Sequence, residues 1–239
     1  MGVFRANAKN EGSKVNYKSV FPNKQSLLVV VHIANNEQAI RNVGVAMMGG
    51  ADGVFLIDHG GYSEIDTARA VHEAFPDVWL GINRLGCSLV RAFDELSSYI
   101  RGVWTDTAAI DERFDDQVEA HLTQINRVKA SWSGLYFGGV AFKYQRPVED
   151  LEMAAKKAAP YMDVLCTSGP GTGRAADEEK IRRLCAASTI PVAIASGVTP
   201  ENVDLYPEAS CFLVATGISR SFHELDPDKV KALAGKLRK

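Results

Sequence analysis

Long apolar runs and an excess of charge of one sign are both missing from this sequence of 239 residues. A membrane-spanning helix needs roughly 20 apolar residues in a row, and no such run occurs. The stretch up to residue 26 is polar and mixed, unlike a signal peptide. Lysine and arginine number 27 against 29 acidic residues, so the net charge of -2 favours neither nucleic acid nor a membrane surface as partner. We expect a cytoplasmic protein.

Cysteine is scarce, and its four occurrences lie far apart: Cys87, Cys166, Cys185 and Cys211. No two of them have the spacing of a metal site. Each lies in an apolar or helical context, which favours buried free thiols in a reducing compartment. Cys166 comes just before a glycine-rich loop, so a reactive thiol is the alternative there, although a core thiol is favoured.

A glycine fingerprint is absent after the first apolar run, where the turn reads HIANNEQ. A Rossmann sheet would place its glycines at that turn. The chain instead alternates eight apolar runs with helix-patterned segments, as parallel strands with crossovers do. An open doubly wound sheet would give the same alternation, but eight units, this length and glycine loops at the last strands favour a barrel.

We therefore predict an α/β fold, a single (β/α)₈ TIM barrel over residues 27–239. A short polar extension, residues 1–26, would be a loose tail or a cap over the bottom of the barrel. The expected strands are 27–33, 53–57, 78–82, 102–105, 135–142, 163–167, 191–195 and 211–215. The expected helices are 35–48, 63–75, 88–99, 111–129, 147–159, 177–187, a short one from 200, and 226–237.

Small residues follow the last three predicted strands, and the sixth strand leads into the loop SGPGTGR. Glycine and serine let an anion approach backbone N–H groups closely. TIM barrels commonly bind phosphate after strands 7 and 8. Plain tight turns and a flexible connection are the alternatives. The predicted phosphate-binding residues are Ser168, Gly169, Gly171, Gly173, Ser196, Gly197, Thr216 and Gly217.

Polar side chains stand at the ends of the other predicted strands, where a barrel has its catalytic mouth. Asp58 would act as a general base or bind a metal or sugar hydroxyls, or it simply forms a turn. Asp106 would be an acid, a base or a Mg²⁺ ligand. Lys143 would anchor an anion, pair with a carboxylate or, less favoured, form a Schiff base. Asn83 would bind a hydroxyl or carbonyl, and His32 is either a site residue or a core histidine.

The segments TSGPGTGRAADEEKIRRL, IPVAIASGVTPENV and FLVATGIS resemble the C-terminal third of the BtpA family. Val31-His32, Gly81-Ile82-Asn83 and FKYQRPVEDLEMAAKKA resemble earlier parts of that family. The resemblance runs from about Phe21 to the C-terminus and is specific only after Asp163. After His32 this chain reads IANNEQAIRN where the family has a proline-rich loop, so we expect the site to differ there.

The resemblance implies a ribulose-phosphate-binding type of barrel, in a family linked to photosystem I biogenesis and to sugar-utilisation gene clusters. We expect an enzyme acting on a phosphorylated sugar or a ribose-phosphate-containing metabolite, as an isomerase, a lyase or a hydrolase. The alternative is a non-catalytic BtpA-like assembly factor that retains a ligand pocket. The expected partner is a small phosphorylated substrate, with a homo-oligomer by analogy to other barrels. No metal ligands and no certain cofactor are predicted; Mg²⁺ is left open.

Overall fold

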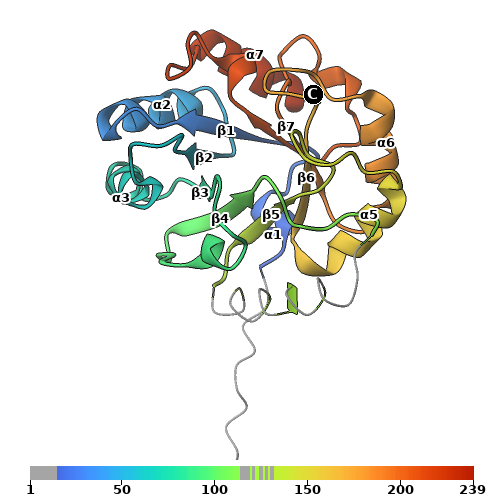
Figure 1. The fold of residues 1–239 in the computed structure, drawn as a ribbon. Helices are drawn as coiled ribbons and strands as arrows, with labels where there is room; N and C mark the ends of the chain where they lie inside the picture. The colour runs from blue at the N-terminus through green and yellow to red at the C-terminus, as the bar shows by residue number, and fades with distance from the viewer. Residues whose placement is uncertain (1–14, 114–118, 120–121, 124–125, 127–128, 130–131) are drawn as a thin grey trace, which may run out of the picture.

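The computed structural model describes residues 15–113, 119, 122–123, 126, 129 and 132–239, and these form a closed barrel of parallel strands (Figure 1). Each strand pairs with the next in the chain, and the last pairs with the first. The predicted TIM barrel is thereby confirmed. The strands are β1 (Ser26–His32), β2 (Gly53–Ile57), β3 (Leu80–Asn83), β4 (Ile100–Thr105), β5 (Leu135–Gly139), β6 (Val164–Thr167), β7 (Val192–Ala195) and β8 (Cys211–Val214).

Helices surround the barrel on the outside in Figure 1. Polar N-caps begin them: Asn35, Ser63, Asp150, Asp177 and Asp226 each accept a hydrogen bond from a backbone N–H of the first turn. The helices are α1 (Tyr17–Val20), α2 (Asn36–Met48), α3 (Glu64–Ala74), α5 (Leu151–Ala158), α6 (Glu178–Ala187) and α7 (Pro227–Leu237). Short 3₁₀ turns are Arg91–Phe93, Ala159–Tyr161, Val203–Leu205 and Thr216–Ile218.

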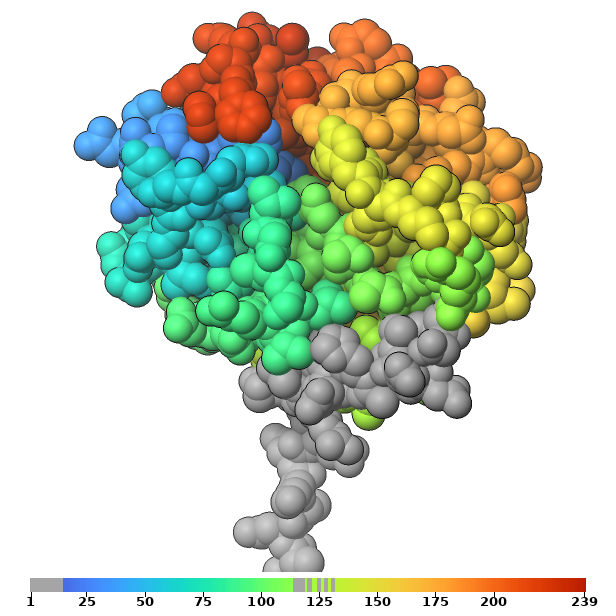
Figure 2. Space-filling view, in the orientation of Figure 1, coloured from blue at the N-terminus to red at the C-terminus, as the bar shows by residue number. Residues whose placement is uncertain are grey.

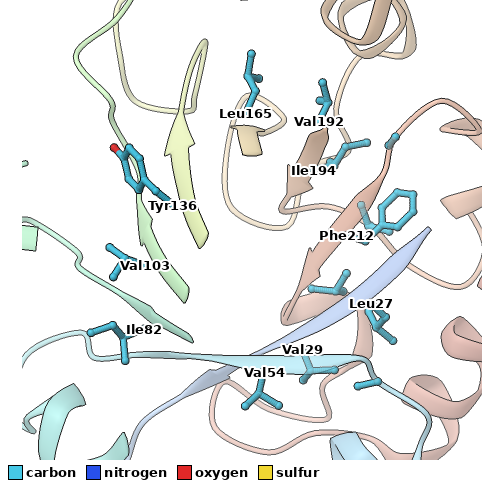
Figure 3. Close-up of a cluster of buried hydrophobic side chains, with 14 of the residues drawn as sticks. Leu27, Val29, Val54, Ile82, Val103, Tyr136, Leu165, Val192, Ile194 and Phe212 are labelled. Atoms are coloured by element: carbon cyan, nitrogen blue, oxygen red, sulfur yellow. The ribbon is translucent and has the colours of Figure 1, made fainter. Parts of the chain in front are cut away.

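Successive residues of a strand point to opposite faces of the sheet, and this alternation divides the core into two layers. Leu27, Val29 and Val54 belong to the layer between the barrel and its helices, part of which Figure 3 shows. Leu28 and Phe55 belong to a second layer that fills the barrel interior. The sheet is therefore buried on both faces, which accounts for the nearly continuous apolar runs of the strands.

The N-terminal extension contributes to the barrel interior from residue 15 onward. Tyr17 and Phe21, on and just after α1, are each 3% exposed and pack with Trp79 in the interior layer. The Tyr17 hydroxyl also donates a 2.7 Å hydrogen bond to the carbonyl of Ser210. Of the two roles considered for residues 1–26, the described part therefore acts as a cap on the barrel.

One predicted helix is wrong: residues 88–99 form only the 3₁₀ turn Arg91–Phe93. The Arg84 guanidinium donates hydrogen bonds to the carbonyls of Ala92 (3.2 Å) and Asp94 (2.5 Å). Glu95 then takes a positive φ of 59°. Carbonyls held by an arginine and a left-handed residue do not continue a helix.

Smaller differences concern element ends. The helix predicted from 147 begins at Leu151, because Asp150 rather than Pro147 caps it. Strand β5 ends at Gly139, before Lys143. The short helix expected from 200 is reduced to the 3₁₀ turn Val203–Leu205. The helix predicted over 111–129 falls largely outside the described residues. No helix in the part that is described is long and apolar enough to span a membrane.

Candidate active site

A cavity of about 350 Å³ lies at the carboxyl ends of the strands. In Figure 2 the surface is hollowed near its centre, among segments coloured red, cyan, green and yellow. The end of β1 and the loops after β2, β3, β4, β5, β6, β7 and β8 contribute to its wall. The lining residues include His32, His59, Leu85, Trp104, Asp106, Lys143, Tyr144, Thr172, Ser196, Gly197, Thr216, Gly217 and Phe222.

Asp106 is the one carboxylate among the described residues that line this cavity. It follows β4, and its Oδ1 accepts a 3.0 Å hydrogen bond from the side-chain amide of Asn83, which is buried at the end of β3. Burial raises the pKa of Asp106, and the hydrogen bond from Asn83 and the charge of Lys143 oppose that rise. A raised pKa makes a carboxylate a stronger base than an ordinary aspartate.

Lys143 is the one lysine or arginine among the described residues of the cavity wall. Its backbone N–H donates a 2.8 Å hydrogen bond to the hydroxyl of Ser168. Its ammonium lies 5.5 Å from the ring centroid of Phe142 and has no hydrogen bond or ion pair to a described residue. The charge is therefore available to an anionic group of a ligand.

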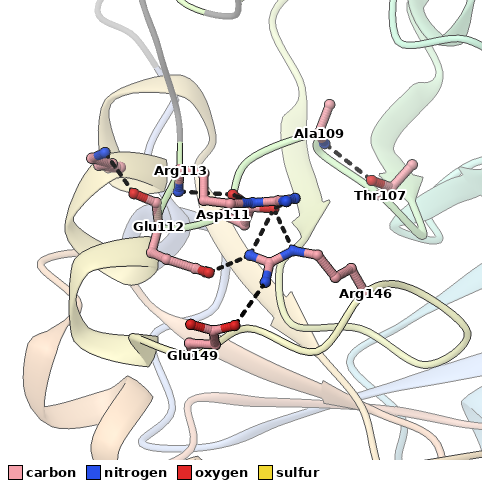
Figure 4. Close-up of polar contacts among 8 residues, drawn as sticks. Thr107, Ala109, Asp111, Glu112, Arg113, Arg146 and Glu149 are labelled. Atoms are coloured by element: carbon pink, nitrogen blue, oxygen red, sulfur yellow. Dashed lines mark hydrogen bonds and ion pairs between the residues drawn. The ribbon is translucent and has the colours of Figure 1, made fainter.

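A network of charged side chains joins the loops that carry Asp106 and Lys143 (Figure 4). Arg146, after β5, pairs with Asp111 and Glu112, which both follow β4. The hydrogen bond from Arg113 lowers the pKa of Asp111 to about 2, so Asp111 stays ionised. Gln145 also donates a hydrogen bond to the backbone carbonyl of Asp106. These contacts fix the two loops, and with them Asp106 and Lys143, relative to each other.

Ser196 connects the β7 loop to the glycine loop after β6. Its hydroxyl donates to the carbonyl of Gly171 at 3.0 Å and accepts from the N–H of Gly173 at 3.1 Å. Its own φ is 102°, a costly conformation for a residue with a side chain. Strain of this kind is common in ligand clamps, and here it brings Thr172 and Ser196 to the same wall of the cavity.

At two positions of this wall only glycine fits, because the backbone of a neighbouring loop approaches the Cα closely. A Cβ on Gly197, whose φ is 72°, would lie 2.1 Å from the carbonyl oxygen of Arg174. A Cβ on Gly217 would lie 1.9 Å from the carbonyl oxygen of Val198. Gly171 is different, because a Cβ there would meet only side chains, Arg174 at 3.4 Å and the Tyr144 hydroxyl at 3.6 Å, which is ordinary contact. The packed loops present backbone and small side chains to the cavity.

His32, at the end of β1, packs against the rings of His59 and Phe222 at the cavity mouth. Its Nδ1 is buried and makes no hydrogen bond to a described residue. Burial lowers the pKa of His32 to about 4, with the nearby His59 adding to the effect. Burial also lowers the pKa of His59. His32 is therefore a neutral imidazole at neutral pH.

The structure places the predicted site residues differently with respect to this cavity. His32, Asp106, Lys143, Ser196, Gly197, Thr216 and Gly217 line the cavity. Asn83 and Gly173 contact that wall through Asp106 and Ser196, and the Gly171 carbonyl accepts from Ser196. Ser168 and Gly169 line a neighbouring cavity instead.

Asp58 is not part of the cavity lining either, because its carboxylate accepts hydrogen bonds from the N–H groups of Gly60 (3.0 Å) and Tyr62 (3.3 Å). This is the turn-forming role that was the alternative for Asp58. Cys166 is fully buried and burial raises its pKa, as a core thiol requires.

The sequence prediction omits His59, Thr172 and Phe222 as site residues. Each carried a signal: His59 follows Asp58 at a strand end, Thr172 lies inside the glycine loop, and Phe222 is an aromatic residue in a polar segment. Among the described residues, no three His, Cys, Asp or Glu side chains gather as metal ligands do.

Neither a family model nor a curated protein matches the chain. Solved structures do. Phosphoribosyl anthranilate isomerase from Thermus thermophilus aligns with a TM-score of 0.62 and 19% identity, over 88% of this chain and 98% of that one. A structure described as native KDPGal aligns with a TM-score of 0.66 and 17% sequence identity, over 90% of this chain and 96% of that one. Thiamine phosphate pyrophosphorylase from Pyrococcus furiosus aligns with a TM-score of 0.63 and 14% sequence identity, over 90% of this chain and 96% of that one. Identity this low shows a common fold.

Proposed function

We propose that this chain is a cytoplasmic enzyme that acts on a phosphorylated sugar or a ribose-phosphate-containing metabolite. The observation that carries the proposal is one cavity with two chemically different walls. Small residues and backbone of the β6, β7 and β8 loops form one wall, and Asp106 with Lys143 forms another. Two proteins of similar fold, phosphoribosyl anthranilate isomerase and thiamine phosphate pyrophosphorylase, are by name enzymes of phosphorylated compounds.

The phosphate would be bound by Ser196-Gly197 and Thr216-Gly217, with Thr172 beside them. Support comes from the close packing of these loops, which leaves no room for larger side chains at Gly197 and Gly217. Thr216–Ile218 is a 3₁₀ turn, and the first N–H groups of such a turn have no acceptor within it. Phosphate oxygens are suitable acceptors for such N–H groups.

The chemistry would be proton transfer next to a carbonyl or at a C–N bond, as in isomerisation or lyase reactions. Asp106, with its raised pKa, would take a proton from one atom of the substrate and return it to another. Lys143 would stabilise the negative charge that develops on the carbonyl oxygen. An imine on Lys143 is the alternative, and borohydride trapping in the presence of substrate distinguishes the two.

The finer parts of the prediction remain proposals. BtpA family membership is supported by the sequence segments after Asp163. A requirement for Mg²⁺ would be met by Asp106 together with substrate phosphate, because Mg²⁺ often takes only one or two carboxylates from the protein. Assembly of several copies is proposed only by analogy with other barrels.

The experiment is a thermal-shift screen with inorganic phosphate, ribose 5-phosphate, other sugar phosphates and nucleoside monophosphates, with and without Mg²⁺. A ligand present at a hundred times its dissociation constant adds about 2.7 kcal/mol to stability. We expect a phosphorylated sugar or nucleotide to stabilise the protein far more than inorganic phosphate does. No response to any compound would contradict the proposal and favour the non-catalytic assembly factor.

A further inference from the structure

Three aromatic rings form a cluster at the cavity mouth: His32, His59 and Phe222. The ring centroids are 4.9 Å apart for His32–His59, 4.2 Å for His32–Phe222 and 5.1 Å for His59–Phe222. All three residues line the cavity, yet Phe222 is 54% exposed. We propose that this ring cluster binds an uncharged planar ring, aromatic or heteroaromatic, carried by the substrate. This substrate assignment rests on the proposed function and makes it more specific.

The loop that presents Phe222 is anchored by buried polar side chains of α2. Gln38 and Asn42 are each 3% exposed, and both donate to the carbonyl of His223, at 2.6 and 2.7 Å. The side-chain Oδ1 of Asn42 in turn accepts a 3.2 Å hydrogen bond from the backbone N–H of Leu225. The backbone on the C-terminal side of Phe222 is therefore fixed. An apolar ring held in place at a cavity mouth is prepared for a ligand at little further entropic cost.

Gln38 also determines where His32 lies. Its side-chain amide donates to the backbone carbonyl of His32 at 3.1 Å and accepts from the N–H of Ala34 at 2.9 Å. One buried side chain thus holds both the end of β1 and the loop after β8. These contacts fix the backbone positions from which His32 and Phe222 project into the ring cluster.

The neutral state of His32 gives an anionic ring of a ligand no ion-pair partner in the cluster. His32 is neutral at neutral pH, since burial holds its pKa near 4. Lys143 and Asp106 carry the charges of the same cavity and lie on other loops. Neutral rings attract a phosphate weakly, whereas they stack well on another ring. Leu85 and Tyr144, both exposed on the rim, extend the apolar surface.

The test compares ligands that differ only in the ring. Isothermal titration would measure ribose 5-phosphate, adenosine and uridine 5′-monophosphates, and adenosine without phosphate. The proteins are wild type, Phe222→Ala, Phe222→Leu and the control Met48→Ala, whose side chain is 84% exposed at the far end of α2. We expect at least one nucleotide to bind about tenfold tighter than ribose 5-phosphate.

Phe222→Ala should remove most of that gain and leave the affinity for ribose 5-phosphate within about twofold, and Phe222→Leu should show whether the ring itself is required. Equal affinities for ribose 5-phosphate and both nucleotides would overturn the ring subsite while leaving the phosphate site intact. Phe222-dependent binding of adenosine without binding of any phosphate compound would overturn the proposed function alone. No binding of any compound would overturn both.

Discussion

The side-chain amide of Asn83 and the carboxylate of Asp106 are joined by a 3.0 Å hydrogen bond between the ends of β3 and β4. Asn83 is buried, and its own Oδ1 has no partner among the described residues. The amide is thus oriented by Asp106, and Asp106 is held at the cavity wall by the amide. Burial raises the pKa of this carboxyl, so keeping it ionised in the folded protein costs free energy.

Replacing Asp106 with Asn should therefore not destabilise the protein at pH 7. The folded-state pKa lies above the ordinary value of 3.8, so the stability contribution of this group is greatest in acid. That contribution is lost as the pH rises through the raised pKa. In Asp106→Asn no buried carboxyl has to be ionised, so this loss of stability does not occur. The amide oxygen of the new side chain still accepts the hydrogen bond from Asn83. Urea unfolding at pH 7 should show a variant at least as stable as wild type. The control is Asp77→Asn, at an exposed position. A marked loss of stability in Asp106→Asn that the control does not show would refute the inference.

His32 makes stability fall in mild acid. Its pKa is lowered from 6.5 to about 4 by burial, so the unfolded chain binds a proton there before the folded protein does. Stability is fully present above pH 6.5 and decreases as the pH falls toward 4, by up to about 3 kcal/mol. His32→Gln should flatten this part of the stability–pH curve, measured by urea unfolding. A His32→Gln protein that keeps the wild-type loss of stability below pH 6.5 would contradict the burial of His32.

Gly197 and Gly171 should respond differently to substitution. Gly197→Ala places a Cβ 2.1 Å from a carbonyl oxygen at a φ of 72°, whereas the Cβ of Gly171→Ala meets only side-chain atoms at 3.4 Å or more. We expect Gly197→Ala to lower the unfolding free energy by about 2 kcal/mol or more. Gly171→Ala should stay within about 0.5 kcal/mol of wild type. Similar unfolding midpoints for the two variants would show that the loops do not pack as described.

Lys143→Met should leave stability nearly unchanged, within about 0.5 kcal/mol, because its ammonium has no hydrogen bond or ion pair to the described residues. It should raise the pKa of Asp106 further, since the charge of Lys143 opposes the effect of burial. Carboxyl NMR titration measures that pKa. The matched control is Lys231→Met, exposed on α7; an unchanged Asp106 pKa in Lys143→Met would remove the proposed coupling.

The barrel was predictable because apolar strand runs and capped helices are local signals. Gly53–Ile57 and the Ser63 cap lie where the sequence indicated. Residues 88–99 were not predictable in this way, because Arg84 takes carbonyls of that segment through its side chain. Cavity-lining residues were predictable where they closely follow an apolar strand run, as Asp106 and Ser196 do. Asp58 and Ser168 bind their own loops, and Phe222 reaches the cavity through a loop whose anchors, Gln38 and Asn42, lie far away in the sequence.

The most direct measurement is solvent deuterium exchange into the best ligand of the phosphate screen, followed by proton NMR in wild type and Asp106→Asn. We predict that Asp106→Asn binds this ligand within a few-fold of wild type, because the proposed phosphate site lies at another wall. We also predict that catalysed exchange or turnover falls by about a hundredfold or more, because the proton-transferring group is gone. Undiminished exchange in the variant, or loss of binding together with exchange, would contradict a cavity with separate phosphate and acid–base walls.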